Sequence, residues 1–258
     1  MSVHFTVSDH VARVTIDRPE RMNAVDSRTE ERLIEIWGEI EQRDDVRCIV
    51  LTGAGDRAFS AGADMKEEKA KNGLEYWAAS RPGGFGGIAL RTTIDVPLIA
   101  RVNGFAFGGG FEMVLGADIV VACEEAQFGL TEPRVGRLPL EGGMVLLTRR
   151  VPRNLALGLL LTGRRYPAAE LYRWGLLNEV VSREKLDEAV ESWVADILAC
   201  APLSVKAIKH TVQNTTHLSP REAQAAKTGP LLAALASEDG LEGVRAFVEK
   251  RAPVWQGR

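Results

Sequence analysis

The first fifty residues carry one hydrophobic pattern typical of strands and another typical of a helix. Apolar and polar residues alternate over Phe5–Asp9 and Val11–Ile16, which predicts a hairpin. Asp26 or Ser27 can cap a following helix, whose apolar residues fall on one face: Leu33, Ile36, Trp37 and Ile40. The short apolar run Cys48–Gly53 is then a predicted buried strand, so the chain begins in the order β-β-α-β.

The middle of the chain repeats the order of strand, turn and helix, and the remainder is mostly helical. Pro97–Val102 and Asp118–Cys123 are predicted strands, separated by a helix that begins at Glu112. Beyond Glu141 only Asn178–Val181 is extended, and the predicted helices are Ala168–Trp174, Glu184–Cys200, Leu203–Val212, Pro220–Ala236 and Leu241–Glu249. This order of elements predicts an α/β or α+β architecture.

A glycine run stands between the predicted strand Pro97–Val102 and the helix at Glu112. Gly108, Gly109 and Gly110 remove every Cβ from the turn, which leaves backbone N–H groups open to an approaching molecule. These groups lie where a helix N-terminus adds partial positive charge, a suitable place for a developing oxyanion. Glycine runs also serve tight turns and close packing, so both interpretations stay open at this point.

A second candidate N–H donor comes from the loop after the strand Cys48–Gly53. Three small residues, Ala61, Gly62 and Ala63, precede a charged stretch that resembles a helix start. We expect the N–H groups of Ala63 and Gly109 to be able to clamp one carbonyl oxygen.

Composition excludes several classes of function. The chain has 258 residues, 45% of them hydrophobic and 26% charged, which suits a globular protein with a substantial core. A net charge of −3 gives no electrostatic case for binding nucleic acid or an anionic membrane. No apolar run is long enough to span a membrane, and the first residues lack a basic region followed by an apolar one. We therefore expect a cytoplasmic protein.

No metal site is expected from the sequence. The four histidines show no ligand spacing. Cys48, Cys123 and Cys200 are odd in number and lie in apolar runs, which favours buried reduced thiols over a disulfide or a metal site.

Six segments together resemble the crotonase, or enoyl-CoA hydratase, superfamily. In family order they are Asp17–Ala24, Phe59–Asp64, Asn103–Glu112, Ala126–Gly129 with Glu132, Leu161–Arg164 and Phe247–Arg251. The resemblance implies a spiral of β-β-α repeats over residues 1–166, which holds the acyl-CoA site. It further implies a helical region over residues 167–258 that builds homotrimers, often paired into hexamers.

The resemblance also implies a pair of catalytic carboxylates. Glu112 is the second residue after the glycine run, and Glu132 lies 20 positions further on. Hydratases of the family have two glutamates at this interval. Either residue alone would more simply be a surface carboxylate. By resemblance, Glu132 exchanges the proton at Cα and Glu112 holds and activates the water that adds at Cβ. The implied reaction is reversible hydration of a 2-enoyl-CoA to a 3-hydroxyacyl-CoA, without a metal or redox cofactor.

Coenzyme A enters as part of the substrate, and the resemblance assigns its contacts. They are Arg21 and Met22 in the turn after Glu20, the loop residues Ala61, Asp64 and Met65, and Phe247 and Lys250 reaching a neighbouring subunit. The family often has a lysine where this chain has Glu20, so the cation is displaced to Arg21. Lys250 is equally well explained as an exposed helix residue.

The acyl group is left open by the sequence. Many short-chain hydratases have Pro-Gly-Ala-Gly-Gly where this chain has Pro139–Gly143, which places Leu140 and Glu141 near the pocket. Glu141 is either a carboxylate at a helix start or a group that faces a polar or cationic acyl chain. The C-terminal stretch from Ser237 resembles the carnitinyl-CoA dehydratase branch, whose substrate carries a quaternary ammonium. The glycine-rich stretch Ser80–Gly87 is either a cover for the acyl pocket or a plain surface loop.

Two further functions remain alternatives. Glu132 alone could move a proton between carbons, as a double-bond isomerase requires, and Glu112 is the residue that favours hydration. A non-catalytic scaffold that binds RNA or CoA is a second alternative. The acidic chain does not favour it.

Overall fold

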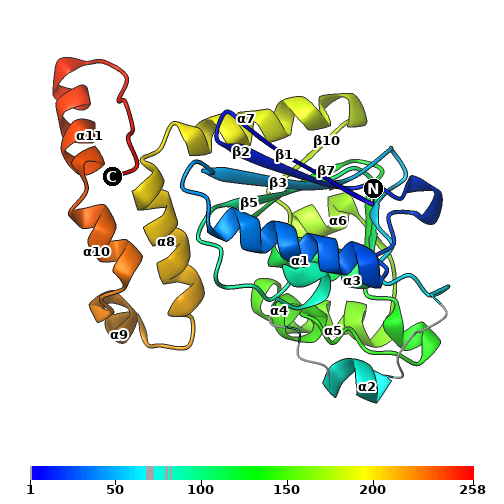
Figure 1. Ribbon diagram of the computed structural model, residues 1–258. Coiled ribbons are helices and arrows are strands. Elements are labelled where there is room, and N and C mark those ends of the chain that lie inside the picture. Colours follow the sequence, from blue (N-terminus) through cyan, green and yellow to red (C-terminus); the bar gives the residue numbers. More distant parts are fainter. Residues whose placement is uncertain (1, 68–72, 79–80, 82) are drawn as a thin grey trace.

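Two β-sheets and a layer of helices form the molecule, and the computed structural model describes residues 2–67, 73–78, 81 and 83–258. Figure 1 shows the larger sheet beside α1 (Ser27–Glu41), with a group of C-terminal helices standing next to this main body. The larger sheet has six strands in the order β1-β2-β3-β5-β7-β10. Their bounds are Val3–Ser8, Val11–Ile16, Cys48–Gly53, Leu98–Val102, Ile119–Cys123 and Glu179–Val181.

The predicted N-terminal hairpin is present, and the rest of the large sheet is parallel. β1 pairs with β2 antiparallel, whereas β2, β3, β5, β7 and β10 pair in parallel with their neighbours. Parallel strands are covered on both faces, which agrees with the fully buried run of β3 from Cys48 to Leu51.

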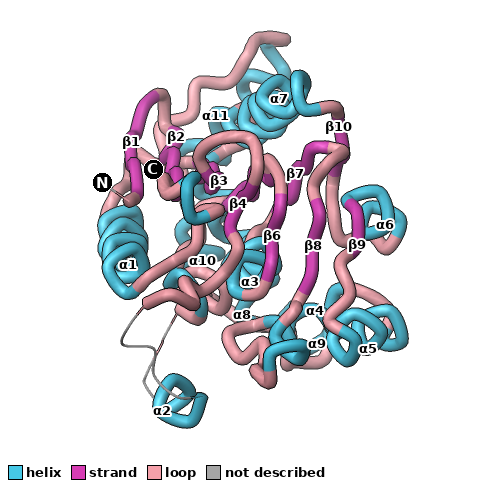
Figure 2. Tube along the Cα trace, turned by 90° about the vertical axis from the view of Figure 1, so that its right-hand side faces the viewer, coloured by secondary structure: helices cyan, strands magenta, loops and turns pink. Residues whose placement is uncertain are grey.

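A second, smaller sheet has the order β4-β6-β8-β9 and was not predicted from the sequence. Its strands are short: Ala58–Ser60, Phe105–Phe107, Gln127–Gly129 and Tyr166–Pro167. Figure 2 shows them side by side. Along the chain, β3, β5 and β7 enter the large sheet and are each followed by a strand of the small one. This alternation is the predicted spiral of β-β-α repeats.

The predicted face of α1 is confirmed. Leu33, Ile36, Trp37 and Ile40 are all buried, and Asp26 is the N-cap, with its carboxylate accepting the Thr29 N–H at 2.8 Å. The Trp37 indole N–H donates to the Gly86 carbonyl at 2.7 Å. This bond fixes the glycine-rich stretch against α1.

The short helix α2 (Gly73–Ala78) lies in the part of the chain that precedes this stretch. Helix α3 (Gly109–Gly116) begins three residues before the predicted start, at the glycine run itself. The helices that follow are α4 (Gly143–Arg150), α5 (Arg153–Thr162), α6 (Ala168–Arg173) and α7 (Leu186–Leu198).

The C-terminal helices stand beside the main body (Figure 1). They are α8 (Pro202–Asn214), α9 (Pro220–Ala225), α10 (Gly229–Leu235) and α11 (Glu238–Glu249). The single helix predicted over Pro220–Ala236 is wrong, because the chain leaves helical geometry at Ala226 and restarts at Gly229-Pro230. Proline lacks the N–H that a continuous helix needs and disfavours helical geometry in the residue before it.

The predicted boundary between residues 166 and 167 falls within β9, and the division into two regions stays a prediction. Cys48 and Cys123 are buried as expected, but Cys200 is exposed because it lies just beyond the end of α7. Among the described helices, none combines the length and the apolar character needed to cross a membrane.

Candidate active site

A cavity of about 540 Å³ lies along one edge of the small sheet. Its walls come from segments that directly follow β4, β6 and β8, namely residues 61–65, 108–112 and 131–141, together with Phe85. Because β4, β6 and β8 are parallel, their carboxyl ends meet at the same edge, where segments distant in sequence converge. The small sheet therefore brings part of the predicted site together: Ala61, Ala63, Met65, Gly109, Glu112, Glu132, Leu140 and Glu141.

The loops that carry Ala63 and Gly109 touch at Gly62. Gly62 has a φ of +85°, and a Cβ added there would lie 2.8 Å from the Phe107 oxygen and 2.9 Å from the Gly109 nitrogen. Only glycine fits this approach. Both Ala63 and Gly109 line the cavity, and neither N–H donates to another described residue. Both amides are thus without a described acceptor at the cavity wall.

Close packing also explains the glycine run. A Cβ on Gly110 would clash with the Ser60 carbonyl oxygen, and one on Gly109 would lie 2.5 Å from the Phe85 ring. Gly108 has a φ of +53°, and its N–H donates to the Gly129 carbonyl at 2.9 Å. The two interpretations of the run therefore hold at once, because the packing that requires glycine also leaves the Gly109 amide at the cavity wall.

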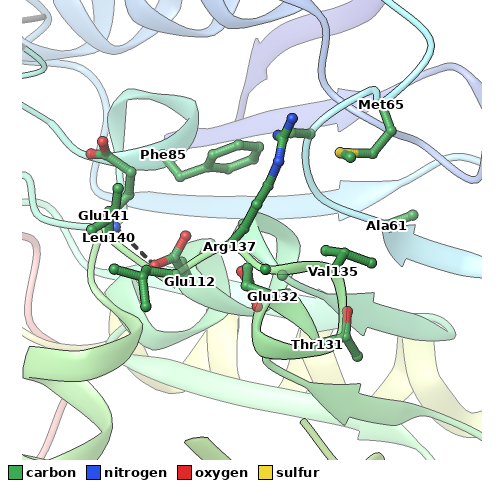
Figure 3. Close-up of a pocket in the computed structure, with 15 residues that line it drawn as sticks. Ala61, Met65, Phe85, Glu112, Thr131, Glu132, Val135, Arg137, Leu140 and Glu141 are labelled. Atoms are coloured by element: carbon green, nitrogen blue, oxygen red, sulfur yellow. Dashed lines mark hydrogen bonds between the residues drawn. The ribbon is translucent and has the colours of Figure 1, made fainter. Parts of the chain in front are cut away.

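Glu112 lies in the first turn of α3 and is only 3% exposed. Its Oε1 accepts two backbone N–H bonds, from Glu141 and Gly143, each at 2.9 Å; Figure 3 shows the bond from Glu141. Burial raises the pKa of Glu112 to about 8, and the charges of Glu132 and Glu141 act in the same direction. The two N–H bonds oppose this shift but do not cancel it.

Glu132 begins a 3-10 turn, Glu132–Val135. Its Oε1 lies 3.2 Å from the position that a Cβ on Gly108 would take. Its Oε2 is buried and has no hydrogen-bond partner among the described residues, and burial raises the pKa of this carboxyl. A buried carboxylate oxygen without a partner is costly, and it is available to a water or a reacting group.

Leu140 and Glu141, which the sequence Pro139–Gly143 placed near the pocket, line the same cavity. Glu141 is 8% exposed and immediately precedes Gly142, the N-cap of α4, so it lies at a helix start as well as at the pocket. Burial raises the pKa of its carboxyl, while the charge of Arg81 lowers it. Its contact with Glu112 is made by the backbone N–H.

The structure places some of the predicted CoA residues at the cavity and others away from it. Ala61 and Met65 line the cavity, and Met65 is 57% exposed. Met22 supports the loop, since its carbonyl accepts the Ala61 N–H at 3.0 Å. The carboxylate of Asp64 pairs with Arg18 at 3.0 Å, whereas the resemblance assigned the backbone of this loop to the ligand.

Five of the predicted CoA residues do not belong to the described cavity wall: Met22 and Asp64, which support the loop, and Arg21, Phe247 and Lys250. Arg21 ends a 3-10 turn, and Phe247 and Lys250 lie at the end of α11 in the separate helical group.

Sequence reasoning missed part of the cavity wall: Phe85, Thr131, Val135, Gly136, Arg137 and Leu138. Ser80 and Pro82 of the glycine-rich stretch lie outside the described residues. Gly83–Gly87 is buried, so the surface-loop alternative is wrong for this part, and Phe85 faces the cavity (Figure 3). The residues after Glu132 showed no periodicity in the sequence that could have placed them.

The chain belongs to the enoyl-CoA hydratase/isomerase family, because the sequence model of that family matches residues 6–258. This membership confirms the resemblance to the crotonases and identifies an enoyl-CoA hydratase-like lyase. A carnitinyl-CoA dehydratase of Salmonella typhi is 39% identical over all of this chain and 99% of its own length. The structure of an enoyl-CoA hydratase from Bacillus anthracis has a TM-score of 0.91 and 30% identity, with full coverage of both chains. A putative short chain enoyl-CoA hydratase from Novosphingobium aromaticivorans has a TM-score of 0.88 and 36% identity, again over both full chains.

Proposed function

We propose that this protein reversibly hydrates a 2-enoyl-CoA to a 3-hydroxyacyl-CoA. The observation that carries the proposal is the pair of carboxyls, Glu112 and Glu132, on one cavity with the open amides of Ala63 and Gly109. Hydration needs a group for the water, a group for the proton at Cα and a site for the charge on the thioester oxygen. The cavity offers a candidate for each.

The two amides serve the thioester oxygen. As water adds at Cβ, negative charge develops on this oxygen, and donors fixed in advance stabilise it without reorganisation. Removing one such donor typically costs about 3 kcal/mol in other enzymes. Contact between the two loops at Gly62 supports this role because it sets the spacing of the Ala63 and Gly109 amides.

The glutamates divide the proton chemistry. Glu132 exchanges the proton at Cα, and its partnerless Oε2 supports that role. Glu112 orients and deprotonates the water, with Oε1 held by two backbone amides and Oε2 left for the water. Since the charge of Glu132 raises the pKa of Glu112, the two carboxyls titrate as a pair and share the protons of the reaction.

CoA would lie along the Ala61–Met65 loop, with Arg21 and Met22 nearby. Phe247 and Lys250 would then act on the ligand of another copy, in a homotrimer or a hexamer. Exposed apolar side chains on α10 and α11 support this assembly: Leu232, Leu235, Leu241, Val244, Phe247 and Val248, of which Phe247 is 85% exposed. Light scattering with size-exclusion chromatography would report three or six copies; a monomer at micromolar concentration would contradict it.

The activity test is ultraviolet absorbance with crotonyl-CoA, because hydration destroys the conjugated enoyl thioester. We expect rapid loss of absorbance with the wild type and almost none with Glu132→Gln. Chromatography of the product separates the 3-hydroxyacyl-CoA from a shifted double bond, so a 3-enoyl product would favour isomerisation. Equal rates in wild type and Glu132→Gln would contradict the mechanism.

The relatives named carnitinyl-CoA dehydratase raise one specialised acyl group as a second candidate. The same residues could remove water from a carnitinyl thioester, whose acyl chain carries a quaternary ammonium. Charge around the cavity bears directly on this candidate.

A further inference from the structure

Arg137 is a cation on the cavity wall that neither the sequence motifs nor the proposed mechanism uses. The turn that carries Glu132 also places Arg137: Gly136 has a φ of +70°, and the Arg137 N–H donates back to the Glu132 carbonyl at 2.9 Å. Figure 3 shows the Arg137 side chain extending over the cavity, toward the side where Phe85 and Met65 lie. Its direction is therefore set by the same short segment that holds a proposed catalytic carboxyl.

The guanidinium of Arg137 has no partner among the residues that the structure describes. Within the described part of the chain it makes no hydrogen bond, ion pair or aromatic contact, although three glutamates line the same cavity. Arg134, on the same turn, instead donates to the carbonyls of Thr162 and Gly163 at 3.0 and 2.9 Å. Arg18, near the 61–65 loop, pairs with two carboxylates at 3.0 Å. Five fixed N–H donors on Arg137 are thus left for a ligand.

Among the described residues, none of the carboxyls on the cavity wall forms an ion pair with this cation. Burial raises the pKa of Glu112, Glu132 and Glu141, which draws all three toward the uncharged form. An arginine stays charged at physiological pH. Among the described residues of the cavity wall, Arg137 is the one basic side chain.

We propose that Arg137 selects the acyl group, by binding a carboxylate at the far end of the enoyl chain and disfavouring a quaternary ammonium there. A guanidinium fork matches a carboxylate with two parallel hydrogen bonds, whereas it repels a cation and offers it no acceptor. The inference rests on the proposed function and refines it. It predicts that this chain prefers a different acyl group from the one in the name of its carnitinyl-CoA dehydratase relatives.

CoA phosphates are a second source of anionic oxygen, and acyl probes of matched shape separate the two. Glutaconyl-CoA carries a carboxylate beyond the double bond, and 5-methylhex-2-enoyl-CoA is its neutral analogue. Crotonobetainyl-CoA carries a trimethylammonium, and 5,5-dimethylhex-2-enoyl-CoA is the matching neutral compound. We expect the wild type to prefer the carboxylate over its analogue by at least about tenfold in kcat/KM, and the neutral compound over the ammonium by a similar factor.

Variants assign the preference to the side chain. Arg137→Gln should bring both ratios to within about threefold of one, and Arg137→Lys should keep part of the preference for the carboxylate. Arg134→Gln removes a charge from the same turn and should leave both ratios unchanged. An equal loss with all four substrates in Arg137→Gln would assign the residue to CoA and overturn the proposal, as would a wild-type preference for the ammonium.

Binding keeps this test separate from the test of hydration. Calorimetry with the saturated pair glutaryl-CoA and 5-methylhexanoyl-CoA measures the same preference without turnover. A tenfold preference for glutaryl-CoA that disappears in Arg137→Gln would support the selectivity even if no enoyl-CoA were hydrated. Equal affinities in the wild type would overturn it even if crotonyl-CoA were hydrated rapidly.

Discussion

Glu112 and Glu132 have different surroundings, although both are acidic and both lie on one cavity. Glu112 is held by two backbone amides, whereas Glu132 has a buried oxygen without a partner among the described residues. Glutamine retains the carbonyl oxygen that accepts the two amides at Glu112, so the substitution removes acid–base chemistry with little change in packing. The substitution therefore distinguishes the acid–base role of Glu112 from its role as a hydrogen-bond acceptor for the backbone.

Glu112→Gln and Glu132→Gln should each lower kcat more than about a hundredfold, in the range that general acid–base groups contribute. Steady-state kinetics with crotonyl-CoA measures the loss, and circular dichroism checks that both variants fold. The double variant should lose little more than the worse single variant, since the two groups act as a unit. Turnover near that of the wild type in either single variant would refute the division of roles.

At the residue scale, prediction from sequence depended on motif position. Glu112 and Glu132 were found because they follow a glycine run and lie at a known interval. Phe85 was hidden in a glycine-rich stretch without periodicity, although it is buried and packs over Gly109. Arg137 follows a polar break, and only the folded turn at Gly136 shows that it faces the cavity.

At the element scale, the proposed oxyanion site depends on two loops that touch at a single glycine. Gly62→Ala would force a Cβ into the Phe107 carbonyl and the Gly109 amide, in a conformation that alanine rarely adopts. We expect kcat to fall by about a hundredfold or more, because the spacing of both donors changes.

Gly38→Ala is the matched control for that substitution. Gly38 lies inside α1, where an added Cβ would meet nothing within 4 Å, so alanine should raise stability by up to about 1 kcal/mol and leave kcat unchanged. Kinetics and thermal melting of both variants test the pair. If Gly62→Ala kept full activity, the contact between the loops would not control the donors.

The elements themselves were predicted unevenly. β1 and β2 were found from their alternation of apolar and polar residues, and β3, β5 and β7 were found because they are longer apolar runs. The two- and three-residue strands of the small sheet, such as β6 (Phe105–Phe107), carry too little pattern, and β6 lies inside a stretch taken as a turn. Yet this small sheet brings the segments of the site together. The spatial arrangement of the site therefore could not be predicted from the motifs.

At the scale of the whole molecule, the buried carboxyls link stability to pH. Glu112 has a pKa near 4.5 when unfolded and about 8 when folded, so the native state holds a proton that the unfolded chain releases. The free energy of unfolding should therefore be highest near pH 4.5 with respect to this group and decline as the pH rises to about 8. Glu132 and Glu141 act in the same direction.

Glu112→Gln should remove that part of the decline. One pKa unit corresponds to about 1.4 kcal/mol, and 1 kcal/mol shifts Tm by roughly 2–4 °C in a chain of this size. We expect the variant to melt within about 2 °C of the wild type at pH 5 and at least about 4 °C above it at pH 8. Calorimetric melts across this range measure the difference; a constant difference would show that Glu112 is ionised at neutral pH in the folded protein.

Incorporation of oxygen-18 from labelled water is the most direct test of hydration by the two glutamates. Crotonyl-CoA is incubated with the protein in oxygen-18-labelled water, and mass spectrometry locates the label in the product. The two-glutamate account predicts a 3-hydroxyacyl-CoA with one labelled oxygen at C3 from the wild type, and none above background from Glu112→Gln or Glu132→Gln. An unlabelled isomer from the wild type, or full labelling by either variant, would contradict it.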